Sequence, residues 1–205
     1  MVDYERTAAR AGVAVPVWTL GTILLATLLS PSFSWTVNAL SNLGAETDVA
    51  TSLTILVFNG GLITGGIAGV AFAAALWLGS RHPLERLGAV VYGIAVLSMA
   101  GVGVFPQDRA LHFPMAAGFY LLFTVAFWCY GAGNVLDGER IRGLVTIGLG
   151  VAHLAMWVGW VQVVGLAGGG LAIPEIVGAL IFGGWTIATA RLHLDGERSL
   201  GRPNT

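Results

Sequence analysis

A histidine in the middle of a long apolar stretch is the clearest candidate for chemistry in this sequence. Trp157 and Trp160 follow His153 at i+4 and i+7, which places the imidazole and both indoles on one face of a helix. An ionisable group at membrane depth is costly without a partner, so His153 is a candidate site residue. The alternative is a neutral histidine that is hydrogen-bonded to a neighbouring helix, with the tryptophans packed around it.

A second group of ionisable residues lies between two other apolar stretches. The guanidinium of Arg109 is suited to bidentate phosphate binding. Asp108 and His112 are four residues apart, so on a helix they would share a face and could pair. Alternatively, Pro114 starts the helix and leaves both residues in a turn.

Neither a metal site nor a catalytic nucleophile has a complete pattern. Asp108, His112, His153 and Glu175 are residue types that bind zinc, but there is no His-Glu-x-x-His motif, and the single cysteine, Cys129, lies inside an apolar stretch. We therefore expect no metal and no cofactor.

A serine hydrolase is the remaining catalytic alternative. Ser41 with His112 and Asp108 would make a formal triad, but the Gly-x-Ser-x-Gly motif is absent. Whether the protein is an enzyme is left open by the sequence, which favours a function without catalysis. If the protein is a hydrolase, His112 or His153 would be its general base.

The elements that must position these residues are six apolar stretches, each close to the about 20 residues that cross a bilayer as a helix. With 56% hydrophobic and 10% charged residues and a mean hydropathy of +0.79, the 205-residue chain has too little polar surface for a soluble domain. We predict an all-α, polytopic integral membrane protein, a single domain over residues 1–205. Its six transmembrane helices are expected at about 11–29, 52–78, 87–104, 115–135, 143–165 and 174–190.

Arginine distribution predicts the orientation of this bundle. With both termini on one side, that side carries nine of the ten basic residues, and the other side carries only Arg109. The positive-inside rule then predicts a multi-pass protein of the plasma membrane with both termini cytoplasmic. The net charge of −1 argues against nucleic acid as a partner, and the complete absence of lysine suggests a prokaryotic or archaeal source. The nine arginines are Arg6, Arg10, Arg81, Arg86, Arg140, Arg142, Arg191, Arg198 and Arg202.

Glycines at a spacing of four mark one face of the second span. Gly61, Gly65 and Gly69 would let another helix approach closely, either within the chain or in a homo-oligomer. The stretch 52–78 is also longer than the bilayer requires, so this helix must tilt, project outward or kink near Asn59-Gly60-Gly61. Asn59 itself is interpreted either as an interhelical hydrogen-bond partner or as a site residue.

Three short motifs in a fixed order indicate a family. They are Asn38-Ala-Leu-Ser-Asn-Leu-Gly44, Phe58-Asn-Gly-Gly61, and Gly103-Val-Phe-Pro106 followed by His112. The chain resembles the six-span prokaryotic proteins known as domain of unknown function 998. More remotely it is similar to the damage-regulated autophagy modulators, some of which act on lipids; where these have aspartate in the outer loop, this chain has Asn42.

These observations predict a binding site on the outer side of the membrane. Polar groups that face lipid are expensive, so those in the spans must turn inward, beneath the outer loops. We expect one outward-facing polar cavity that binds lipid headgroups, with membrane lipids as partners. The alternative function is a non-enzymatic scaffold or regulatory partner that uses the glycine-rich helix faces. The predicted ligand-binding residues are Ser41, Asn42, Asn59, Asp108, Arg109, His112 and His153.

Overall fold

Each apolar stretch forms one helix in the computed structural model, which describes the backbone of residues 3–165 and 169–200 and the side chains of 6–165 and 169–195. No strand occurs in these ranges. All six helices are long and apolar enough to cross a membrane, which confirms the predicted all-α membrane fold. The helices are α1 (Asp3–Leu28), α2 (Ser52–Gly79), α3 (Pro83–Val104), α4 (His112–Leu136), α5 (Arg140–Val163) and α6 (Ala172–Leu200), with a short 3₁₀ helix, η1 (Leu40–Gly44), after α1.

Several helices extend beyond the predicted spans. The prediction ended each span near the first charged residue, whereas α1 begins at Asp3 and α5 at Arg140. A helix continues into water until its backbone is interrupted, so the apolar stretch marks only the part in lipid. α4 begins at His112, and Pro114 lies in its first turn, where a missing N–H costs nothing.

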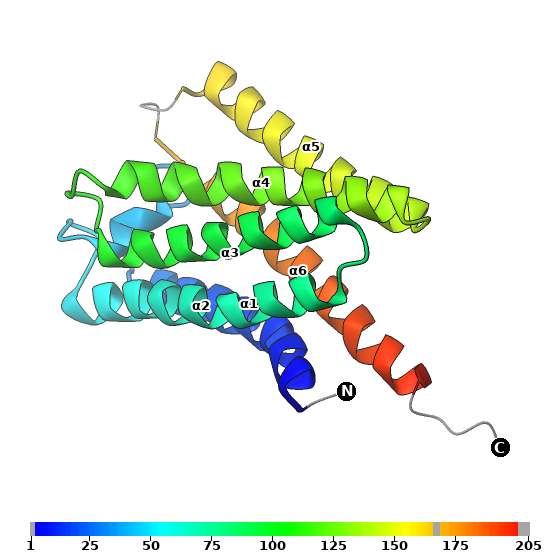
Figure 1. Cartoon of the computed structure of the whole chain (residues 1–205). Helices are drawn as coiled ribbons and strands as arrows, with labels where there is room; N and C mark the ends of the chain where they lie inside the picture. The colour runs from blue at the N-terminus through cyan, green and yellow to red at the C-terminus, as the bar shows by residue number, and fades with distance from the viewer. Residues whose placement is uncertain (1–2, 166–168, 201–205) are drawn as a thin grey trace.

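The contacts between helices follow the chain order and close as a ring. Each of α1 to α5 contacts the next, and α6 packs mainly on α1 and only lightly on α5. α1 begins and α6 ends at the same end of the bundle, here called the terminal end, and η1 lies at the opposite end, here called the η1 end (Figure 1). Of the arginines used to predict orientation, Arg202 and the side chain of Arg198 lie outside the described residues.

The glycine face of α2 packs against two helices of the same chain. A Cβ atom on Gly61 or Gly65 would overlap Thr22 or Thr19 of α1, and one on Gly69 would lie 3.0 Å from a Val96 methyl of α3. The close approach is therefore intramolecular, and a dimer through these glycines would require α1 or α3 to move away. The helix continues as one 28-residue α-helix through Asn59-Gly60-Gly61.

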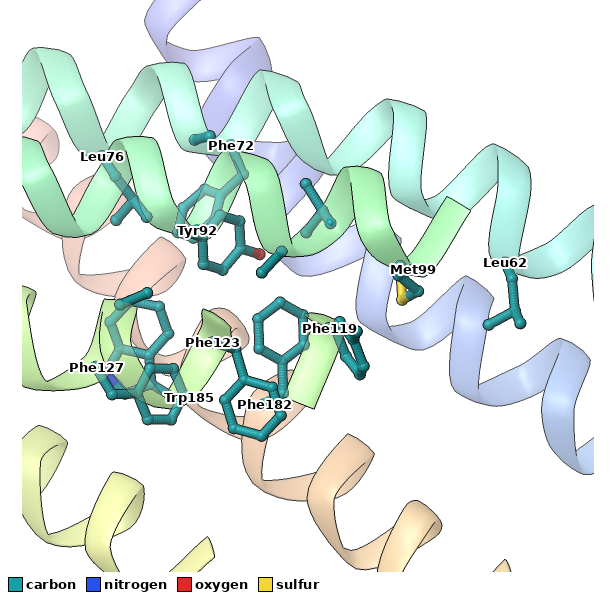
Figure 2. Close-up of a cluster of buried hydrophobic side chains, with 14 of the residues drawn as sticks. Leu62, Phe72, Leu76, Tyr92, Met99, Phe119, Phe123, Phe127, Phe182 and Trp185 are labelled. Carbon is teal, nitrogen blue, oxygen red and sulfur yellow. The ribbon is translucent and has the colours of Figure 1, made fainter. Parts of the chain in front are cut away.

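Aromatic side chains fill the middle of the ring (Figure 2). Tyr92 of α3 stacks on Phe182 of α6 at a centroid distance of 5.1 Å, and Phe127 of α4 lies 4.6 Å from Trp185 of α6. Large side chains are needed here because α6 does not approach the backbones of α3 and α4 closely. The cluster supports the inner face of α6, which positions the site described next.

Candidate functional site

A hydrogen-bonded cap at the η1 end joins the segments singled out in the sequence. Asn42 of η1 accepts a bond from the Ala39 N–H (2.8 Å) through Oδ1, and its Nδ2 donates to Gln107 Oε1 (2.5 Å). Asn59 of α2 donates from Nδ2 to the Gly44 carbonyl (2.8 Å). Asn42 thus links η1 to the α3–α4 connection, and Asn59 links α2 to η1.

Two ionisable residues hold the other side of the cap. His112 places Nδ1 2.8 Å from the Phe105 carbonyl oxygen; a carbonyl can only accept, so Nδ1 carries the proton. Glu175, in the first turn of α6, accepts a bond from the Leu40 N–H through Oε2 (2.6 Å). The Tyr120 hydroxyl donates to the Glu175 carbonyl (3.0 Å). The carboxylate therefore stabilises both the start of α6 and the start of η1.

A cavity of about 70 Å³ lies beneath this cap. It is lined mainly by α1, α4 and α6, with smaller contributions from η1, α2 and α3, and its surface is almost entirely apolar. Five polar residues contribute to the lining: Thr19, Ser41, His112, Tyr120 and Glu175. The apolar lining includes Val15, Leu20, Ile23, Phe58, Leu62, Met99, Ala116, Phe119, Ala179 and Phe182.

The predicted site residues occupy different places. Ser41 and His112 both line the cavity, each 8% exposed. Asn42 and Asn59 belong to the cap, where hydrogen bonds to the chain engage their side chains, and neither lines the cavity.

Asp108 and Arg109 do not reach the cavity, contrary to prediction. They pair with each other on the surface at 3.3 Å between Oδ2 and Nε, with side chains 65% and 68% exposed. Successive turns, in which the Arg109 N–H donates to the Pro106 carbonyl and the His112 N–H to the Arg109 carbonyl, hold them in the α3–α4 connection. Asp108 also does not pair with His112, whose Nδ1 bonds the chain instead.

His153 lies outside the cavity as well, so the expected single site is wrong in this respect. It is 2% exposed, between α4, α5 and α6, and Nδ1 lies 2.8 Å from Thr124 Oγ1. Thr124 donates its own proton to the Tyr120 carbonyl, so it accepts from His153. The ring of Tyr120 stacks on His153 at 5.7 Å and lines the cavity on its other side.

Three polar cavity residues were not among the predicted ligand-binding set. Glu175 was named among the residue types that bind zinc but not as a ligand-binding residue; the available signal was an acid directly before a long apolar stretch. Tyr120 and Thr19 gave no signal, since a tyrosine or threonine in a span is ordinary core. Thr19 Oγ1 is buried with no hydrogen-bond partner among the described residues.

The arrangement favours binding over catalysis. In a serine triad the base is oriented by a carboxylate, whereas here a backbone carbonyl orients His112, and Glu175 bonds the Leu40 N–H. The formal triad with Asp108 is excluded by the exposed position of that residue. Among the described residues, no three of His, Cys, Asp and Glu are grouped so that they could hold a metal ion.

Comparison with known proteins identifies the family. The model for "Protein of unknown function (DUF998)" matches residues 13–192. The chain belongs to the DUF998 family. This DUF998 protein is also similar to lipoprotein signal peptidases from Brucella ovis, Brucella canis and Brucella suis, each 27% identical over 159 residues that cover 70% of this chain and 92% of the relative. No solved structure matches the chain.

Proposed function

We propose that this DUF998 protein binds part of a lipid chain in the cavity beneath the cap. The observation that carries the proposal is the lining: an almost entirely apolar wall in which three of the five polar residues, Ser41, His112 and Glu175, lie at the η1 end. A hydrocarbon chain suits such a wall, and the polar end of the same molecule would meet the cap. The headgroup contact expected at Arg109 has no support, because that side chain is exposed and paired.

Under the predicted orientation of the bundle, this cavity lies in the outer leaflet. The terminal end carries the arginines of the α2–α3 and α4–α5 connections, together with Arg6, Arg10 and Arg191. The positive-inside rule puts that end in the cytoplasm of a plasma membrane and the η1 end outside. The ligand is therefore a lipid, or a lipid-bearing molecule, that reaches the protein from the outer leaflet.

The similarity to proteins named lipoprotein signal peptidase supports a lipid-bearing ligand, because a lipoprotein carries hydrocarbon chains. We do not extend the peptidase activity to this chain. Ser41, His112 and Glu175 share one cavity, but the hydrogen bonds of His112 and Glu175 lead to backbone groups rather than to one another. Binding needs only the cavity, whereas hydrolysis would need a base oriented toward a nucleophile.

Native mass spectrometry of the purified protein tests the proposal. Ala179→Phe fills the cavity from α6, and Ala68→Phe adds the same side chain to an exposed position of α2. Wild type and Ala68→Phe should retain one lipid that Ala179→Phe loses. Equal retention in all three proteins would overturn the cavity assignment. Retention of a protein partner in place of lipid would favour the scaffold function instead.

Orientation has its own test. In a Cys129→Ser background, an impermeant thiol reagent should label Asp108→Cys in intact cells and should label Glu139→Cys only after lysis. Both positions are exposed and lie in connections at opposite ends of the bundle. The reverse labelling pattern would place the cavity in the cytoplasmic leaflet.

A further inference from the structure

A groove of about 870 Å³ runs between α5 and α6 in the half of the bundle nearer the terminal end. It forms because α6 packs on α1 and contacts α5 only lightly. The groove and the cavity share no lining residue: on α6 the cavity is lined by Ala179 and Gly183, and the groove by Leu180 and Gly184. The two hollows therefore lie on different faces of α6.

The groove is long enough to hold one hydrocarbon chain of a single leaflet. On α6 its lining extends from Leu180 to Asp195, about 22 Å at 1.5 Å per residue, against about 15 Å for half of the hydrocarbon core. A side chain on Gly184 would meet nothing within 4 Å, so this glycine leaves open space on the groove wall.

The polar groups of Trp185 and Thr146 on the floor of the groove are already hydrogen-bonded within the chain. Trp185 Nε1 donates to Thr146 Oγ1 (3.0 Å), and Thr146 donates to the Arg142 carbonyl (2.9 Å). These groups satisfy one another, so the wall they present is apolar in effect. Such a surface suits a hydrocarbon chain better than a peptide, whose backbone would need partners.

Charged residues line the groove only where it reaches the terminal end. Arg142 is half-buried there, and Glu139 and Asp195 line the same end. The guanidinium of Arg142 and the carboxylate of Glu139 complement a headgroup with one phosphate and one ammonium, since each charge of the headgroup then meets its opposite. A purely anionic headgroup offers no group that binds the Glu139 carboxylate.

We propose that this groove is a second lipid site, which binds one phospholipid with a phosphate and a primary ammonium, such as phosphatidylethanolamine, from the leaflet at the terminal end. An acyl chain lies along Gly184, the phosphate contacts Arg142, and the ammonium contacts Glu139. The site goes beyond the proposed function, because it lies in the opposite leaflet and does not depend on the cavity.

The test uses full-length protein in nanodiscs of equal parts phosphatidylethanolamine and phosphatidylglycerol, followed by native mass spectrometry. Wild type should retain one phosphatidylethanolamine that Gly184→Leu loses. Gly148→Leu is the matched control, since Gly148 is also an exposed helical glycine with open space around it but does not line the groove. Arg142→Gln should weaken retention about tenfold, the effect of losing a charge-assisted hydrogen bond, and Arg140→Gln should not.

Three outcomes would overturn the groove site. They are equal retention by Gly184→Leu and Gly148→Leu, equal binding of the two phospholipids by wild type, and equal effects of the two arginine substitutions. Ala179→Phe separates this proposal from the cavity: it should leave the bound phosphatidylethanolamine in place even where it removes the cavity lipid. Equal thermal unfolding temperatures for the two leucine variants ensure that a lost lipid reflects the groove rather than misfolding.

Discussion

The glycines of α2 and those of α5 and α6 show that the same residue builds opposite surfaces. On α2, a Cβ at Gly61, Gly65 or Gly66 would overlap a neighbouring helix. On α5 and α6, a Cβ at Gly148 or Gly184 would meet nothing within 4 Å. The first set brings helices together, and the second leaves open space beside the helix.

The difference lies in the partner helices rather than in the glycines. α1 presents Thr19 and Thr22 to α2, and α3 presents Val96 and Ala100, all compact side chains that fit against a bare backbone. α6 offers α5 a narrow contact at Gly178, where a Cβ would lie 3.0 Å from His153 Nε2. The contact of α5 with α6 therefore depends on a few side chains, whereas α2 packs closely on both of its neighbours, as α5 does on α4 where a Cβ on Gly143 would overlap the Gly131 carbonyl.

The largest expected effect is at Gly66. Gly66→Leu should destabilise the protein by about 1–3 kcal/mol or more, because the side chain would overlap the Val96 carbonyl and the Ala100 backbone of α3, which cannot rotate away. Gly148→Leu should change stability by less than about 0.5 kcal/mol. Thermal unfolding in one detergent measures both, and similar shifts would remove the distinction between the two glycine sets.

A hydrogen bond between α4 and α5 should also matter. Thr124→Val leaves the His153 Nδ1–H buried without an acceptor and should cost about 1–3 kcal/mol. Adding His153→Phe should recover part of this loss, because removing both partners is cheaper than orphaning one. A double-mutant cycle of unfolding free energies measures the coupling. Additive effects would show that this pair does not hold α5 to α4.

The cap provides an intermediate case. Glu175→Leu removes the acceptor for the Leu40 N–H and should cost about 1–3 kcal/mol, whereas Glu175→Gln keeps an acceptor and should cost less. Limited proteolysis near η1 should rise in the leucine variant alone. Identical proteolysis of the two variants would mean that the carboxylate does not hold η1 in place.

The smallest effect is expected at the surface pair. Arg109→Ala should change stability by about 0–1 kcal/mol, since Arg109 and Asp108 are both largely exposed to solvent. It should also leave copurified lipid unchanged, unlike Ala179→Phe. Loss of lipid in Arg109→Ala, measured by extraction and mass spectrometry, would return this residue to the binding site.

The fold was largely predictable because the length and apolarity of the six stretches alone require six helices in lipid. The site, in contrast, depends on how each helix is rotated about its own axis. A helix boundary is a property of the local chain, and the errors there concern only charged flanks such as Asp3 and Arg140. Asp108 and Arg109 were assigned to the correct end, yet the turn between α3 and α4 exposes them to solvent. His153 was correctly expected to face inward, but it faces a different space from His112. The end of the bundle at which a side chain lies follows from sequence, but which interior space it meets depends on how helices pack.

The bond between Glu175 and the Leu40 N–H constrains how the protein is made. Its partners are 135 residues apart, and α6 must also dock on α1 to close the ring. During synthesis the first five helices therefore enter the membrane before the cap or the cavity can exist. A chain that stops before Ala172 would lack the residue that accepts from Leu40, so truncation products should remain open along α1 and be targets for quality-control proteolysis.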